Sequence, residues 1–166
     1  MDVIGPIILK ALNGHEYILV AIDYFTKWVE ATSYKSVTQA TVARFLKHNI
    51  ICHYSVPGKL ITDNGTNING KMIQQLCQQF KIEHRNLVPY RPQMNGAVEA
   101  INKNIKKIFV KMTDIYKDWH EYLPFALCAY HTFILTSMGA TLYSLVYGME
   151  AMFPAKVEIP SLRILS

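Results

Sequence analysis

The stretch that decides the fold is residues 59–88, KLITDNGTNINGKMIQQLCQQFKIEHRNLV. Lys59–Thr62 predicts a short strand, and Asp63-Asn64-Gly65 predicts a turn directly after it. Apolar side chains then recur at helical spacing, at Met72, Ile73, Leu76, Cys77 and Phe80. Residues 82–88 follow as a second short strand. Because parallel neighbouring strands need a helix to carry the chain back, this order predicts an α/β protein.

Three further strands are predicted before this unit. They are residues 3–9, Tyr17–Ile22 and 28–34, with turn signals such as Asn13-Gly14 between them. Their short connections predict an antiparallel meander. The pattern then changes to a helical period, and Thr38 is suited to cap a helix that runs to about Cys52. A meander followed by strand–helix–strand units predicts a mixed sheet with helices on both faces.

The second half of the chain is predicted to be helical. Residues 89–96 are rich in Pro, Asn and Gly and predict a loop, and helices follow over 97–112, 119–135 and 141–147. We expect one domain over residues 1–154 and an extended C-terminal tail over 155–166. Trp28 and Trp119 are expected to pack inside the domain rather than to stack on bases.

Composition excludes several classes of protein. The chain has 166 residues, of which 51% are hydrophobic and 17% charged, as in a globular domain. A net charge of +5 mildly favours a polyanionic partner. The apolar runs are too short to span a membrane, and residues 1–6 do not resemble a signal peptide. The three cysteines form no disulfide framework, so we expect them to be reduced and packed in apolar surroundings.

Three carboxylates stand out as candidates for chemistry, although each also has an ordinary explanation. Asp63 follows a strand, where ligand sites of α/β sheets form, but Asp-Asn-Gly is also a common turn. Glu99 shares a helical stripe with Asn102, Lys103 and Lys106, which is equally typical of a solvated helix face. Asp2 lies in the first strand, near a chain end. Together the three carboxylates predict an all-oxygen site for a hard cation such as Mg²⁺, with Lys103 and Lys106 beside it to hold phosphates.

The motifs around these residues resemble the catalytic core of retroviral-type integrases. The segments that carry the resemblance are residues 61–66, ITDNGT, and 89–99, PYRPQMNGAVE. Thirty-five residues separate Asp63 from Glu99, as in the D,D-35-E signature of that family. Further segments resemble integrases of gypsy-type LTR retrotransposons, especially the plant-like branch: residues 1–6, MDVIGP, 17–31, YILVAIDYFTKWVEA, and 143–148, YSLVYG.

The resemblance implies a fold, an activity and a set of site residues. The fold is the RNase H-like fold, a five-stranded mixed sheet flanked by helices. The activity is DNA integration by 3′ processing and strand transfer, a polynucleotidyl transfer that uses Mg²⁺ or Mn²⁺, with two ions per site. Its metal ligands and catalytic residues are Asp2, Asp63 and Glu99; its nucleic-acid-binding residues are Asn64, Asn102, Lys103 and Lys106; and its flexible loop contains Tyr90, Arg91, Gln93, Asn95 and Gly96.

The same resemblance implies partners and leaves alternatives open. The partners are the DNA ends of the element, target DNA and further copies of the chain, in the nucleus, with no membrane and no small-molecule cofactor. Because the sequence starts one residue before Asp2, the alternative is a truncated, non-catalytic remnant that binds nucleic acid or self-associates. Whether the chain is an enzyme therefore stays open at this point. A nuclease acting on the RNA strand of hybrids is a third, weaker interpretation.

Overall fold

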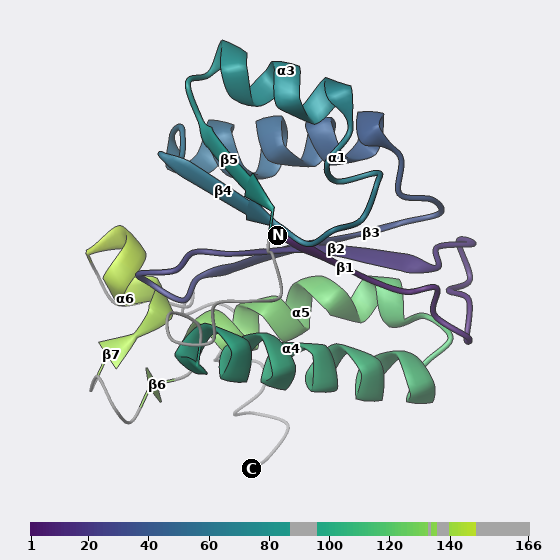
Figure 1. The fold of residues 1–166 in the computed structure, drawn as a ribbon. Coiled ribbons are helices and arrows are strands. Elements are labelled where there is room, and N and C mark those ends of the chain that lie inside the picture. The colour runs from purple at the N-terminus through teal and green to yellow at the C-terminus, as the bar shows by residue number, and fades with distance from the viewer. Residues whose placement is uncertain (87–95, 133, 136–139, 149–166) are drawn as a thin grey trace.

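An antiparallel meander forms one half of the sheet. The computed structural model describes residues 1–86, 96–132, 134–135 and 140–148, and within these it leaves the side chains of residues 96–102, 134–135, 140, 142 and 145 undescribed (Figure 1). The three strands are β1 (Asp2–Ile4), β2 (Tyr17–Ile22) and β3 (Val29–Tyr34). They pair in the order β1-β2-β3, with Asp2 opposite Val20 and Val20 opposite Ala31. The predicted meander is confirmed.

The decisive stretch folds as a parallel strand–helix–strand unit, as predicted. Strands β4 (Lys59–Thr62) and β5 (Glu83–Asn86) pair in parallel, and helix α3 (Lys71–Gln79) carries the chain between them. The two sheets meet where the Met1 amino group donates a hydrogen bond to the Ile61 carbonyl, at 2.6 Å. This contact gives the strand order β3-β2-β1-β4-β5, with one hydrogen bond instead of a ladder between β1 and β4.

Helices cover both faces of the sheet (Figure 1). One face carries α3 and a helical segment that passes from α1 (Gln39–Phe45) through a π-helical stretch, η1 (Leu46–Ile51), to α2 (Cys52–Tyr54). The other face carries α4 (Gly96–Ile115) and α5 (Trp119–Thr132). A two-stranded ribbon, β6 (Ile134–Leu135) and β7 (Ala140–Thr141), and the short helix α6 (Leu142–Tyr147) follow. The mixed α/β fold predicted from sequence is confirmed.

Each face of the sheet has its own hydrophobic core. Alternation along β2 sends Ile18 and Val20 to the α4–α5 side and Leu19 to the α1–α3 side. The first core is completed by Ile105 and Phe109 of α4 and by Trp119 and Leu123 of α5; the second by Val42, Phe45, Leu46, Leu60, Ile73 and Leu76. Trp28 and Trp119 are 7% and 0% exposed, so their predicted packing role is confirmed.

Several boundaries and two cysteines differ from prediction. Strand β1 ends at Ile4, because Gly5 leaves the extended region at φ +133° and the following Ile8 is fully exposed. Helix α5 ends at Thr132 because the next apolar pair, Ile134–Leu135, forms β6 instead. Helix α4 begins at Gly96, so this glycine is helical rather than the last residue of the loop. Of the three free cysteines only Cys77 is buried; Cys52 and Cys128 are exposed.

Removal of the cap at Thr38 is expected to destabilise α1. The Thr38 hydroxyl accepts a hydrogen bond from the Thr41 amide at 3.2 Å, and the Thr41 hydroxyl accepts one from the Thr38 amide at 2.7 Å. Thr38→Ala should lower the free energy of unfolding by about 1 kcal/mol, measured by urea denaturation. Ser36→Ala, an exposed position just before the cap, serves as the control and should change stability by less than about 0.5 kcal/mol. Equal stability of the two variants would contradict a capping role.

Candidate active site

Asp2 lies on β1, on the side of the sheet that faces α4. Its strand neighbours define the two sides: Ile4 packs in the core beneath α4 and α5, whereas Val3 packs against the core of the opposite face. Alternation therefore puts Asp2 on the same side as Ile4. Its side chain is 26% exposed, and its Oδ1 accepts a hydrogen bond from the Val3 amide at 2.8 Å.

Asp63 is the first residue after β4, as predicted. It is exposed, and its Oδ1 accepts a hydrogen bond from the Asn64 amide at 2.7 Å. This bond fixes the carboxylate against the start of the turn that follows the strand. Asn64 is likewise exposed in that turn.

The contact between β1 and β4 brings Asp2 and Asp63 into one neighbourhood. Met1 donates a hydrogen bond to Ile61. Asp2 directly follows Met1 and Asp63 is two residues beyond Ile61, so both residues lie near the carboxyl end of β4. The Met1 amino group interacts electrostatically with the carboxylates of both Asp2 and Asp63. Burial lowers its pKa to about 6, while Asp2 and Asp63 each oppose that lowering and Lys106 adds to it. Two carboxylates and one lysine thus share a local electrostatic field.

Lys106 links α4 to this region of the sheet. Its ammonium forms an ion pair with Oδ2 of Asp2, with both side chains partly exposed. The sequence predicted Lys106 for phosphate contact and gave no sign of this pair, because the pair depends on how closely α4 approaches β1. Lys103, one turn earlier, is exposed as expected.

Glu99 lies in the first turns of α4, seven residues before Lys106. Seven residues are about two turns, or roughly 10 Å along a helix. The side chains of Glu99 and Asn102 are outside the described part of the structure, as are all atoms of the predicted loop residues Tyr90, Arg91, Gln93 and Asn95. The full three-carboxylate site therefore stays a prediction. Within the described ranges, no three His, Cys, Asp or Glu side chains come close enough to hold a metal ion.

The donor chemistry of the two described carboxylates fits a hard divalent cation. Both groups offer only oxygen, and both are partly or fully open to solvent. Neighbouring carboxylates repel each other, and here the ammonium of Lys106 compensates part of that charge. A divalent cation would supply the same compensation more strongly.

One polar cluster lies behind Asp63 and was not predicted from the sequence. The Thr62 hydroxyl is fully buried and meets side chains of Asn69, His84 and Asn86. The one signal in the sequence is a hydroxyl residue at the end of an otherwise apolar strand. Asp23 has a structural role in the β2–β3 turn, where its Oδ2 accepts hydrogen bonds from the amide and the hydroxyl of Thr26.

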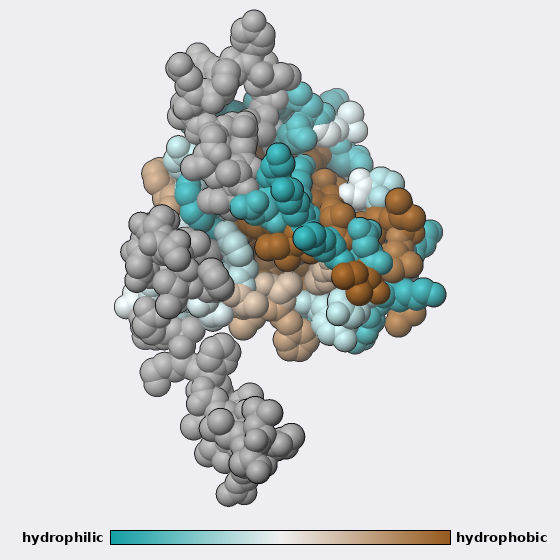
Figure 2. All heavy atoms as spheres, turned by 90° about the horizontal axis from the view of Figure 1, so that it is seen from below, coloured by the Kyte–Doolittle hydropathy of each residue, from teal (hydrophilic) through white to brown (hydrophobic). Residues whose placement is uncertain are grey.

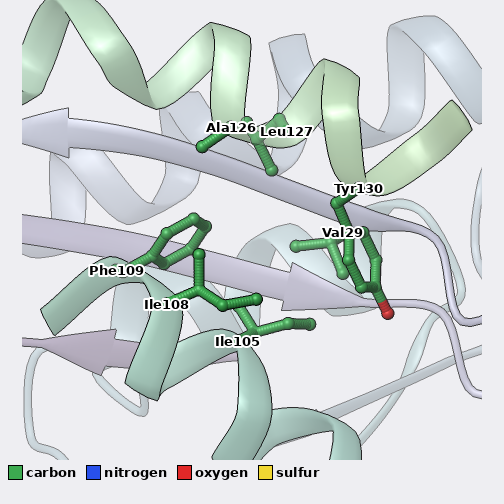
Figure 3. Close-up of a pocket in the computed structure, with 7 residues that line it drawn as sticks. All are labelled: Val29, Ile105, Ile108, Phe109, Ala126, Leu127 and Tyr130. Atoms are coloured by element: carbon green, nitrogen blue, oxygen red, sulfur yellow. The ribbon is translucent and has the colours of Figure 1, made fainter. Parts of the chain in front are cut away.

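A shallow apolar groove between α4 and α5 is a poor candidate for chemistry. Figure 3 shows the residues that line it, from strand β3 and the two helices. The lining residues are Val29, Ile105, Ile108, Phe109, Ala126, Leu127 and Tyr130. The phenol of Tyr130 is the one polar side-chain group among them, and burial raises its pKa. The groove has neither a carboxylate nor a basic group, so the region of Asp2 and Asp63 at the β1–β4 contact is the better candidate active site.

Fold and site place this chain in a known class: it belongs to the integrase core domain family, whose model matches residues 1–92. It is 36% identical over 120 residues to the Gag-Pol polyprotein of avian reticuloendotheliosis virus, and 34% identical over 139 residues to the Pol polyprotein of radiation murine leukemia virus. These matches cover 72% and 82% of the chain, which spans 10% and 24% of the two polyproteins.

Solved structures agree with this assignment. A chain of the simian T-cell lymphotropic virus intasome in complex with PP2A regulatory subunit B56 gamma is similar, with a TM-score of 0.65 and 27% identity over 87% of this chain and 52% of that one. The catalytic core domain of BIV integrase has the same fold, with a TM-score of 0.67 and 24% identity over 89% of this chain and 92% of that domain. The expected RNase H-like fold of a retroviral-type integrase core is thereby confirmed.

Proposed function

We propose that this chain is the catalytic core of a DNA integrase from a gypsy-type LTR retrotransposon of the plant-like branch. The observation that carries the proposal is the contact between Met1 and Ile61, which joins the segments that hold Asp2 and Asp63, together with the ion pair of Lys106 with Asp2. Membership in the integrase core family supports the general activity, DNA integration. The motifs quoted from the sequence support the branch.

Each site residue has a distinct role in this proposal. Asp2, Asp63 and Glu99 hold divalent cations, Mg²⁺ or Mn²⁺. When bound, a pair of such ions activates the attacking oxygen and stabilises the leaving oxygen of an in-line displacement at phosphorus. The Asn64 amide keeps the Asp63 carboxylate oriented. Lys106 pairs with Asp2 in the free protein, and in the complex it contacts a DNA phosphate beside the same carboxylate.

The proposal extends to the partners. Asn64, Asn102, Lys103 and Lys106 contact the DNA of the element or of its target, and the loop with Tyr90, Arg91, Gln93 and Asn95 borders the site. The chain acts as a homo-oligomer in the nucleus. The similar intasome chain supports assembly, as do apolar side chains that remain exposed on α4 and α5, such as Ile115 at 67% and Phe125 at 71%; Figure 2 shows this side of the molecule. None of the described helices is long and apolar enough to cross a membrane.

The experiment that tests the proposed activity uses a reaction that needs only the catalytic core. A branched DNA that mimics the strand-transfer product is incubated with the chain and Mn²⁺ or Mg²⁺, and resolution of the branch is measured. We expect resolution with metal and its loss with EDTA. An RNA–DNA hybrid should be cleaved far more slowly, and preferred cleavage of the hybrid would indicate the RNA-strand nuclease instead.

A second candidate is the non-catalytic remnant, a module that binds DNA without chemistry. The observation that favours it is that Asp2 is already satisfied within the protein, by Lys106 and by the Val3 amide. Salt-dependent DNA binding by a folded chain that shows no metal-dependent resolution would decide for this alternative.

Loss of the charge on Lys103 is expected to weaken DNA binding through one phosphate contact. Lys103→Gln should reduce the slope of log affinity against log salt concentration by about 1, with similar effects for unrelated DNA sequences. Fluorescence anisotropy with labelled duplex DNA at several salt concentrations gives the slope. Lys47→Gln, an exposed position in η1 on the opposite face of the sheet, should leave it unchanged. A shared decrease in both variants would mean that net charge, not position, sets the affinity.

A further inference from the structure

The buried hydroxyl of Thr62 organises a polar cluster directly behind Asp63. It is 0% exposed and lies 2.5 Å from Asn69 Oδ1, 2.9 Å from His84 Nε2 and 3.4 Å from Asn86 Oδ1. A hydroxyl has one proton to donate. Because a buried polar group needs hydrogen-bond partners, these contacts determine which groups donate and which accept within the cluster.

The orientation of the Asn69 amide fixes the direction of the two shorter bonds, to Asn69 and to His84. Its Nδ2 donates to two backbone carbonyls, Asp63 O at 2.5 Å and Gly65 O at 3.1 Å. Carbonyl oxygens only accept, so Nδ2 must face them and Oδ1 must face Thr62. Thr62 therefore donates to Asn69, and its oxygen accepts from His84 Nε2–H. Burial lowers the pKa of His84, which favours the neutral ring that this arrangement uses.

The cluster therefore ends on the backbone of Asp63. Asn69 donates a hydrogen bond to the carbonyl of Asp63, while the Asp63 carboxylate accepts one from the next amide, that of Asn64. The backbone of residue 63 is thus held from inside by a side chain that is itself held by β4 and β5. A rotation of this peptide would change the direction of the Asp63 carboxylate.

We propose that Asn69, locked by Thr62 and His84, is a positioning residue that aims the Asp63 carboxylate at a divalent cation. The inference rests on the proposed function, because it assigns Asp63 the part of a metal ligand. Outer partners of metal ligands typically change metal affinity by 10–100-fold when removed. The cluster would supply that support through the backbone rather than through the carboxylate itself.

The test is Mn²⁺ binding to the intact chain, measured by electron paramagnetic resonance of the free ion, together with branched-DNA resolution. Asn69→Leu preserves the approximate volume and removes both donors. We expect Mn²⁺ affinity about 10-fold weaker or more, and a half-saturating Mg²⁺ concentration for resolution raised by a similar factor. Asn67→Leu makes the same change two residues away, at an exposed side chain, and should match the wild-type chain.

A second pair of variants covers a folding failure of Asn69→Leu, which circular dichroism would reveal. His84→Gln keeps an N–H donor for Thr62 and should retain Mn²⁺ affinity, whereas His84→Leu should weaken it. Wild-type affinity in folded Asn69→Leu, or equal affinity of the two His84 variants, overturns the positioning role. Mn²⁺ binding that depends on Asn69, in a chain that does not resolve branched DNA, supports this inference while it refutes the proposed activity. Absence of Mn²⁺ binding in the wild-type chain overturns both.

Discussion

Asp63→Asn is expected to reduce metal-dependent resolution of branched DNA by more than about 100-fold while the domain stays folded. The size follows from metal chemistry, since the loss of even an outer partner of a ligand costs 10–100-fold and the loss of the ligand itself costs more. The amide oxygen of asparagine is neutral, so it binds a hard cation much less strongly than a carboxylate does. Initial rates at saturating Mg²⁺ measure the effect.

The structure explains why folding should survive this change. Asp63 is exposed, and the one hydrogen bond described for its side chain is accepted from the Asn64 amide at 2.7 Å. The asparagine Oδ1 atom accepts the same bond. We expect the free energy of unfolding to change by less than about 0.5 kcal/mol, as for ordinary surface substitutions.

Asp114→Asn is the matched control for Asp63→Asn. Asp114 is an exposed carboxylate near the C-terminal end of α4, away from the β1–β4 contact. Its neutralisation should leave the initial rate within about twofold of the wild-type rate. Resolution that persists in folded Asp63→Asn would exclude this carboxylate from the chemistry. A similar decrease in both variants would show an effect of net charge on DNA binding.

Secondary structure was predicted correctly where the local residue pattern and the flanking turn residues indicate the same element. Strands Tyr17–Ile22 and Lys59–Thr62 were predicted residue for residue, because each is a short β-forming run with turn residues at its ends. Thr38 caps α1 as predicted, because the capping interaction is local. The first strand was predicted too long, since its apolar pattern continues past the break at Gly5 into a loop where Ile7 is buried and Ile8 is not.

The candidate site was predictable only in part, for a physical reason. A carboxylate after a strand is visible in the sequence, and the integrase motifs placed Asp2 beside Asp63. The pairing of Lys106 with Asp2 depends on how α4 packs against the sheet, which no local pattern encodes. The same holds for Thr62, whose partners Asn69 and His84 come from other segments of the chain. Buried polar contacts of this kind need the tertiary structure.

Trp119→Ala is expected to have the largest effect on stability, with a loss of about 3–5 kcal/mol in the free energy of unfolding. Trp119 is fully buried in the core between the sheet and helices α4 and α5, so alanine would leave a large cavity. Its indole Nε1 also donates to the Leu9 carbonyl at 2.9 Å, which ties α5 to the loop between β1 and β2. Chemical denaturation monitored by circular dichroism measures the loss.

Two comparisons separate the cavity from the hydrogen bond. Trp119→Phe retains most of the ring volume but leaves the Leu9 carbonyl without its indole donor, so it should cost much less than alanine. Phe125→Ala removes a large aromatic side chain from the same helix at a position that is 71% exposed, and should change stability by less than about 0.5 kcal/mol. Equal losses at positions 119 and 125 would contradict the described packing of α5. Because this core also fixes α4, which carries Glu99 and Lys106, Trp119→Ala should weaken the candidate site through the fold rather than through its chemistry.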